Sequence, residues 1–153
     1  MIAPDDLLLL DTNVLIHLIR GKAAGVRIRE ELELVERSER PVISVVTVGE
    51  VRALALKLGW GDGKRAALNE LIRQLVIVGI DSDEVLTRYA EIDHYSEKVA
   101  KPARPFGQND TWIAACASAY GAHLITTDRD FDHLTPRFIE RTGVDGRTGE
   151  ILS

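Results

Sequence analysis

The strongest constraint on the fold is the alternation of short apolar runs with longer segments of helical character. Four runs, at 6–11, 41–46, 75–81 and 123–127, have the length and the Val, Ile and Leu content of buried strands. The gaps between them are long enough for helices, so consecutive strands can run in the same direction. The sequence therefore predicts an α/β domain with a mainly parallel central sheet flanked by helices.

The helices predicted between these strands follow from the periodicity of their apolar residues. They lie at 13–20, 24–38, 47–59, 62–74, 83–99 and 110–121. A glycine-rich stretch at 59–63 predicts the turn between two antiparallel helices, and a fifth strand is a candidate at 137–140. The tail, 143–153, carries turn signals at Asp145-Gly146 and Thr148-Gly149 and is predicted neither as a helix nor as a strand.

Length and composition predict one soluble domain spanning residues 1–153. The formal net charge of −5 argues against a protein that grips nucleic acid by overall charge alone. The single Cys116 lies in an apolar helical run, where we expect a buried hydrophobic residue and no catalytic thiol. The first residues resemble neither a signal peptide nor a membrane span, so we expect no membrane association and a cytoplasmic location.

Four acidic residues fall where strands end or where the following helices begin. They are Asp11, Glu50, Asp110 and Asp128. In a parallel sheet the carboxyl ends of the strands meet at one edge, where such folds place their sites. Each acid also has a structural interpretation: the aspartates can cap helices, and Thr47 to Glu50 has the spacing of a capping box. Asp81 ends an apolar run in the same way, so position alone does not identify a site.

Order, spacing and local context together distinguish the four acids from Asp81. The stretches "LLLLDTNVLI", "PVISVVTVGEV" and "QNDTWIAACASAYGAHLITTDRDFDHL" contain them in sequence. These motifs resemble those of the PIN-domain ribonucleases, and among them the VapC-like toxins of type II toxin-antitoxin pairs. The resemblance covers residues 7–134 and implies a three-layer sandwich, with the four acids in the acidic positions of the family.

The resemblance implies a metal-dependent endoribonuclease that uses Mg²⁺, with Mn²⁺ as a substitute. Water attack would leave a 5′-phosphate and a 3′-hydroxyl, and Mg²⁺ prefers carboxylate and water oxygens. We expect Asp11 and Asp110 to be direct ligands, with Glu50 and Asp128 as further or water-mediated ones. The candidates for a supporting shell around the carboxylates are Thr12, Asn13, Thr126 and Asp130.

The expected partners are RNA, a cognate antitoxin protein and a second copy of the chain in a homodimer. Setting the four acids aside leaves 20 acidic against 19 basic residues, so local basic patches remain available. The candidate RNA contacts are Arg20, Lys22, Arg52, Lys101 and Arg104. Trp60 and Trp112 could stack on bases, although packing is the stronger expectation.

Several other functions remain to be weighed against a toxin. A housekeeping PIN nuclease in RNA processing and a non-catalytic module that binds RNA or a partner fit the same motifs. Aspartyl-phosphate phosphatases need a second aspartate two residues after the first, where this chain has Asn13. Phospho-acceptor signalling domains need a lysine at the end of a late strand, and "HLITTD" supplies none.

Overall fold

The computed structural model describes residues 2–103 and 105–152 and shows a six-stranded sheet in the order β3-β2-β1-β4-β5-β6. The first five strands are parallel, and β6 pairs antiparallel with β5. The strands are β1 (Leu8–Leu10), β2 (Val42–Ser44), β3 (Val76–Val78), β4 (His123–Thr126), β5 (Glu140–Val144) and β6 (Ile151–Leu152). The predicted α/β class and mainly parallel sheet are thereby confirmed.

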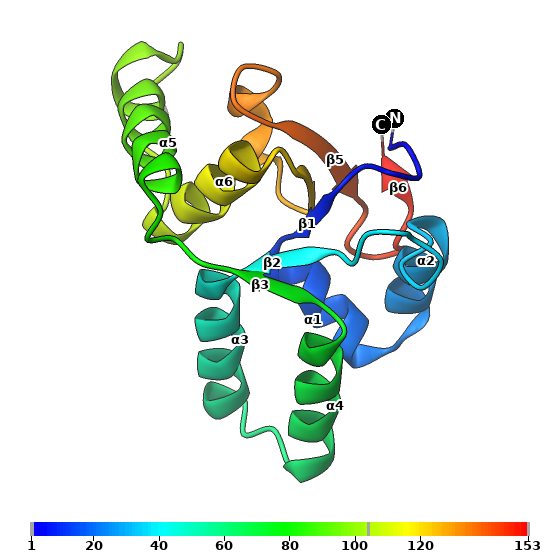
Figure 1. Ribbon diagram of the computed structural model, residues 1–153. Helices are drawn as coiled ribbons and strands as arrows, with labels where there is room; N and C mark the ends of the chain where they lie inside the picture. Colours follow the sequence, from blue (N-terminus) through cyan, green and yellow to red (C-terminus); the bar gives the residue numbers. More distant parts are fainter. Residues whose placement is uncertain (1, 104, 153) are drawn as a thin grey trace.

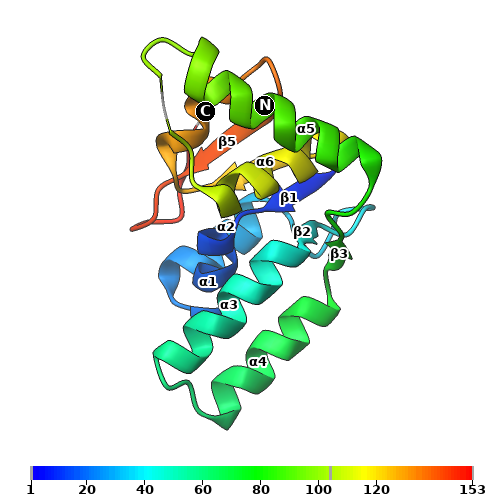
Figure 2. The same ribbon diagram turned by 90° about the vertical axis from the view of Figure 1, so that its left-hand side faces the viewer.

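Helices cover both faces of the sheet (Figures 1 and 2). On one side lie α1 (Thr12–Arg20), α2 (Ala23–Glu31), α3 (Val45–Lys57) and α4 (Asp62–Arg73), and on the other α5 (Asp83–His94) and α6 (Gln108–Tyr120). Short helical turns follow α5, at Tyr95–Val99, and β4, at Arg129–Leu134. The helices α3 and α4 project from the sheet as an antiparallel pair, joined by the predicted glycine-rich turn.

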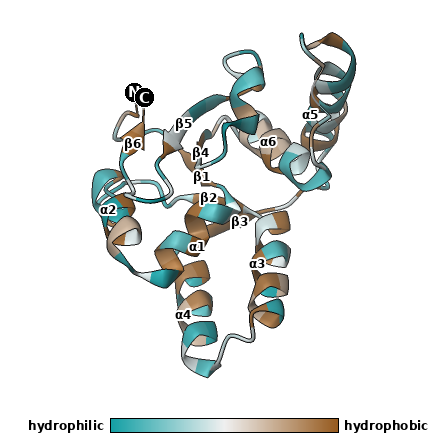
Figure 3. Ribbon diagram, turned by 180° about the vertical axis from the view of Figure 1, so that it is seen from behind, coloured by the Kyte–Doolittle hydropathy of each residue, from teal (hydrophilic) through white to brown (hydrophobic). Residues whose placement is uncertain are grey.

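The sheet separates two hydrophobic cores, and its central strand β1 contributes side chains to both. Leu8 and Leu10 pack with α1 to α4, whereas Leu9 packs with α5 and α6. All three leucines are buried, because successive side chains of a strand point to opposite faces and helices cover both. The surface helices instead alternate hydrophobic and hydrophilic residues, as α3 and α4 show in Figure 3.

The helix predicted at 24–38 is too long, because α2 ends at Glu31. Glu33 adopts a positive φ of 50°, which a helix cannot continue through. Beyond it, the Arg37 guanidinium donates hydrogen bonds to the carbonyls of Ala3, Asp6 and Leu32. These contacts hold residues 32–37 as an irregular segment against residues 3–6, which precede β1.

The fifth strand, predicted at 137–140, begins only at Glu140, the last residue of that range. Phe138 and Ile139 both donate their backbone N–H to the carbonyl of Leu134, so they form a turn before β5. The strand itself runs through Gly143, which pairs with Thr126 of β4. The tail that the sequence left unassigned forms a β5–β6 hairpin, in which Asp145 accepts hydrogen bonds from Arg147 and Thr148.

A smaller difference concerns α5. The predicted helix at 83–99 changes at Tyr95 to a π-helical turn, which directs the buried Ser96 toward His133.

Among the described residues, no helix has both the length and the apolar character that crossing a bilayer demands.

Candidate active site

The carboxyl edge of the sheet is where the four predicted acids meet. Asp11 follows β1, Asp128 follows β4, and Glu50 and Asp110 lie in α3 and α6. The charges of Asp11, Glu50 and Asp128 all act on Asp110, which shows that the four side chains share one electrostatic environment. Asp81, by contrast, is exposed beyond the edge strand β3 and is not among these charges.

Asp11 is the most buried member of the group, with 4% of its surface exposed. It caps α1 by accepting the backbone N–H of Thr12 at 2.8 Å, and its other oxygen accepts the Thr126 hydroxyl at 2.6 Å. Burial raises the pKa of this carboxyl, against the effect of these two hydrogen bonds. The cap and a role in the site are therefore compatible for Asp11, since the hydrogen bonds that cap α1 also fix the orientation of the carboxylate.

Glu50 lies in the second turn of α3, so the predicted capping box is wrong. The N-cap of α3 is Ser44, whose hydroxyl accepts the N–H of Val46. Glu50 instead accepts the Thr12 hydroxyl at 2.7 Å, and the Asn109 amide lies 3.3 Å from its second oxygen. Thr47, one turn earlier, places its hydroxyl 3.1 Å from that of Thr12.

Asp110 carries the clearest electrostatic signature of the site. Burial first, and then the charges of Asp11, Asp128, Glu50 and Asp130, raise its pKa from 3.8 to about 7. It stands third in α6, whose N-cap Gly107 offers no side-chain cap. Negative charges that gather without a cation favour protonation of one of the carboxylates, here Asp110 near neutral pH.

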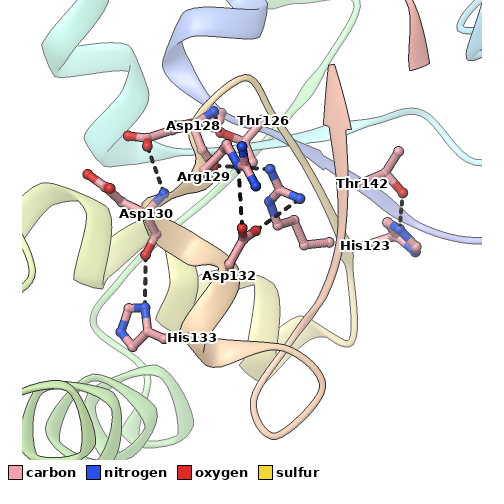
Figure 4. A network of polar contacts seen from close by, with 10 residues as sticks. His123, Thr126, Asp128, Arg129, Asp130, Asp132, His133 and Thr142 are labelled. Carbon is pink, nitrogen blue, oxygen red and sulfur yellow. Dashed lines mark hydrogen bonds and ion pairs between the residues drawn. The ribbon is translucent and has the colours of Figure 1, made fainter. Parts of the chain in front are cut away.

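Asp128 and Asp130 lie together at the start of the turn after β4 (Figure 4). Asp128 caps that turn by accepting the N–H of Asp130 at 2.8 Å, and its own N–H donates to the Thr126 hydroxyl. Thr126 thus connects Asp11 to Asp128. Asp132 is exposed and forms an ion pair with Arg141 at 3.1 Å.

The remaining members of the predicted shell lie beside the acids. Asn13 accepts the N–H of Thr127 through its side-chain oxygen at 3.3 Å, joining α1 to the end of β4. Thr12 and Thr126 hold Glu50 and Asp11, as described above. Asp130 adds its charge to the environment of Asp110.

The chemistry of this donor set fits a hard divalent cation. The four side chains supply carboxylate oxygens, the ligands that Mg²⁺ prefers. Within residues 2–103 and 105–152, no ion pair neutralises any of the four. No three His, Cys, Asp or Glu side chains in those ranges converge closely enough to hold an ion as they stand. Binding would therefore draw the carboxylates closer together.

The predicted RNA contacts are less concentrated than the acids. Arg20 and Lys22 both line a pocket at the junction of α1 and α2. Arg52 is exposed on α3 just beyond Glu50, and Lys101 is exposed in the loop before α6. Arg104 lies outside the described residues. Trp60 is buried and Trp112 stacks on Tyr89 with ring centroids 3.9 Å apart, so packing is confirmed for both.

The sequence analysis assigned no role in the site to three polar residues that contact the acids or their neighbours. Thr47 contacts Thr12, and Asn109 contacts Glu50. Each lies in or next to an acidic motif of the sequence, which is a weak signal for a role in the site. His133 lies 2.8 Å from the Ser96 hydroxyl. Its Nδ1 also lies 2.8 Å from the backbone carbonyl of Asp130 (Figure 4). No local pattern links residues 96 and 133. The buried Cys116 agrees with prediction.

The structure is that of a parallel α/β domain with four acidic side chains at the carboxyl edge of its sheet, which is where such folds place their ligand sites. The family model for the PIN domain matches residues 8–135, so the chain belongs to the PIN domain family. This membership confirms the resemblance inferred from the motifs.

Within the family, the chain is similar to proteins named Ribonuclease VapC. Ribonuclease VapC1 of Haemophilus influenzae (strain R2866) is 28% identical over 129 residues, which cover 83% of this chain and 91% of the relative. Ribonuclease VapC4 of Mycobacterium tuberculosis is 32% identical over 91 residues, which cover 58% of this chain and 67% of that protein.

Solved structures support the fold. A crystal structure of VapBC2 from Rickettsia felis, bound to a promoter DNA fragment, matches with a TM-score of 0.73 at 23% identity. The match covers 88% of this chain and 98% of the chain in that structure. VapBC-1 from nontypeable Haemophilus influenzae matches with a TM-score of 0.70 at 24% identity, covering 90% and 97%.

Proposed function

We propose that this protein is a metal-dependent endoribonuclease that cleaves RNA by attack of water. The observation that carries the proposal is that four carboxylates, from four separate segments, share one electrostatic environment at the carboxyl edge of the sheet. The names of the relatives, Ribonuclease VapC1 and VapC4, point to the same activity. The products would carry a 5′-phosphate and a 3′-hydroxyl.

Asp11 and Asp110 would hold the metal directly, and Glu50 and Asp128 would bind it directly or through water. Mg²⁺, or Mn²⁺ in its place, would polarise the phosphoryl oxygens and lower the pKa of a bound water. Thr126 keeps one oxygen of Asp11 engaged, so the carboxylate has a fixed orientation. Thr12 does the same for Glu50, which leaves its second oxygen directed toward Asn109 and the site.

Asn13 and Asp130 would support the reacting groups without touching them. Asn13 holds the backbone of Thr127, and Asp130 donates its N–H to Asp128. Both contacts set where the Asp128 carboxylate lies relative to Asp11. Supporting bonds of this kind typically change metal affinity or activity by about 10- to 100-fold when removed.

Cleavage of total RNA by the purified protein tests this function. We expect cleavage that requires Mg²⁺, stops with EDTA, and is abolished in Asp11→Asn and Asp110→Asn. Asp81→Asn is the matched control, because it removes the same charge at another strand end. Absence of Mg²⁺-stimulated cleavage in the wild type would reject the nuclease and favour a non-catalytic module that binds RNA or a partner.

We further propose that the nuclease is the toxin of a toxin-antitoxin pair, in the cytoplasm and as a homodimer. The complexes among its structural neighbours, named VapBC, support a cognate antitoxin partner. Expression of the chain alone should arrest growth, and co-expression of a neighbouring antitoxin gene should relieve the arrest. Harmless expression of a protein that cleaves RNA in vitro would favour a housekeeping nuclease.

A further inference from the structure

A small pocket lies beside the acidic edge, where three segments of the chain meet. It has a volume of about 260 Å³ and is lined by the end of α1, the start of α2 and the turn between β5 and β6. Three of its lining side chains are cationic: Arg20, Lys22 and Arg147. Arg20 and Lys22 are close in sequence, but only the hairpin brings Arg147 to them.

Two glycines hold these segments in close contact. A Cβ at Gly25 would lie 2.2 Å from the carbonyl oxygen of His17, so α1 and α2 cross where only glycine fits. A Cβ at Gly149 would lie 2.3 Å from the carbonyl oxygen of Ala24, and Gly149 has a φ of +77°. The hairpin is therefore seated against α2, and the pocket is formed by packed backbone rather than by a loose loop.

The charge of the pocket is positive and accessible. Arg20, Lys22 and Arg147 are all exposed, and Arg147 forms only a long ion pair, 3.9 Å, with Asp145. Asp145 is itself engaged, because its oxygen accepts two backbone N–H groups of the hairpin. The start of α2, which has no side-chain cap, adds the positive end of a helix dipole.

The pocket reaches the end of β4, the segment that leads to Asp128. A Cβ at Gly146 would lie 3.9 Å from the Thr127 side chain and 3.7 Å from Nε2 of His17. Thr127 precedes Asp128, and its N–H donates to Asn13 in the first turn of α1. From Thr12 to the pocket, α1 spans roughly 12 Å. An RNA strand bound over the four acids would therefore pass the cationic pocket within a short distance.

We propose that Arg20, Lys22 and Arg147 bind a backbone phosphate of the RNA strand beside the cleavage site. The acidic edge repels a phosphodiester until a cation is bound, so a neighbouring positive pocket supplies affinity that the acids cannot. The contact is to phosphate and carries no sequence preference. This inference rests on the proposed nuclease function and names how its substrate is held.

Binding of a fluorescently labelled oligouridylate, measured by anisotropy in the Asp11→Asn background, tests the pocket. We expect the combined variant Arg20→Gln, Lys22→Gln, Arg147→Gln to bind at least tenfold more weakly. The slope of log affinity against log salt should fall by about 2, close to three contacts at about 0.7 each. Since the three side chains are exposed, the melting temperature should be unchanged.

The matched control removes the same charge elsewhere, at exposed positions of α3 and α4. It combines Lys57→Gln, Lys64→Gln and Arg73→Gln, and it should keep both the affinity and the salt slope. Equal losses in the two variants would show a general charge effect and overturn the pocket. Polyglutamate is the second probe: loss of polyglutamate binding with RNA binding retained would identify a site for an acidic peptide, which also overturns the proposal.

Cleavage assays with the Asp11 carboxylate intact separate the two hypotheses. If the pocket variant cleaves with a raised KM and a nearly unchanged kcat, the pocket holds substrate and both proposals stand. If it cleaves and binds like the wild type, the pocket proposal fails and the nuclease stands. If the wild type never cleaves although RNA binding depends on the pocket, the nuclease fails and the phosphate site remains.

Discussion

The ends of β1 and β3 offer a direct comparison within the molecule, because both lead from an apolar run to an aspartate. Asp11 follows a central strand and is 4% exposed, whereas Asp81 follows an edge strand whose residues Val76 and Ile77 are themselves 40% and 46% exposed. Strand position in the sheet therefore decides whether a strand-end carboxylate meets other acids or meets solvent.

The two ends also differ in how the following helix is capped. Asp11 caps α1 itself and keeps one oxygen for Thr126. After β3, Ser82 caps α5 by accepting the N–H of Val85, which leaves Asp81 outside the cap. The same local signal, an acid after an apolar run, thus leads to a site in one place and to an exposed turn in the other.

The largest expected difference concerns activity. Asp11→Asn should lower RNA cleavage by at least about a hundredfold, since loss of a charged metal ligand removes several kcal/mol of transition-state stabilisation. Asp81→Asn should cleave like the wild type. Both rates are measured on the same RNA under saturating Mg²⁺. Equal rates in the two variants would contradict the comparison.

Thr126→Val should have the next largest effect. It removes the donor to Asp11 and the acceptor for the N–H of Asp128, while keeping the shape of the side chain. We expect a 10- to 100-fold higher Mg²⁺ concentration for half-maximal cleavage. Thr126→Ser, which keeps the hydroxyl, serves as the control. Its failure to restore the Mg²⁺ dependence would show that packing, not the hydroxyl, is required.

Asp110→Asn should stabilise the metal-free protein, in contrast to its effect on cleavage. The folded state holds a proton on Asp110 up to about pH 7 and the unfolded state only to about pH 4. Stability in EDTA therefore falls as pH rises from 4 to 7, and the variant escapes this loss. Because the carboxyl is partly exposed, solvent screening limits the gain at pH 8 to on the order of 1–2 kcal/mol.

Thermal unfolding in EDTA at pH 4 and pH 8 measures this effect. The advantage of Asp110→Asn over the wild type should be present at pH 8 and vanish near pH 4. Asp81→Asn should show no advantage at either pH. A gain that is the same at both pH values would refute mutual repulsion of the acids as its cause.

The smallest expected effect tests the cap at the other end of the comparison. Ser82→Ala should lower the free energy of unfolding by about 1 kcal/mol through loss of the α5 cap. RNA cleavage should be unaffected, because Ser82 lies with Asp81 beyond the edge strand. Denaturant unfolding and the cleavage assay together check both parts. A loss of cleavage without a loss of stability would place this strand end in the site.

Much of the site was accessible from the sequence because it depends on short-range order. The strand–helix alternation predicts the parallel sheet, and a parallel sheet brings strand ends to one edge. This geometry, together with the motifs, predicts that the four acids lie at the same edge of the sheet. The extent of α2 and the start of β5 were mispredicted, because a positive φ at Glu33 and a turn at Leu134 to Ile139 interrupt patterns that look continuous.

By itself the sequence determined the class of fold, the family and the four acids. Only the tertiary structure decided that Thr12 holds Glu50, that Thr126 holds Asp11 across 115 residues, and that Arg147 joins Arg20 and Lys22. The reason is physical. Periodicity and turn signals act over a few residues, whereas these contacts depend on the order of strands in the sheet, which differs from their order in the chain.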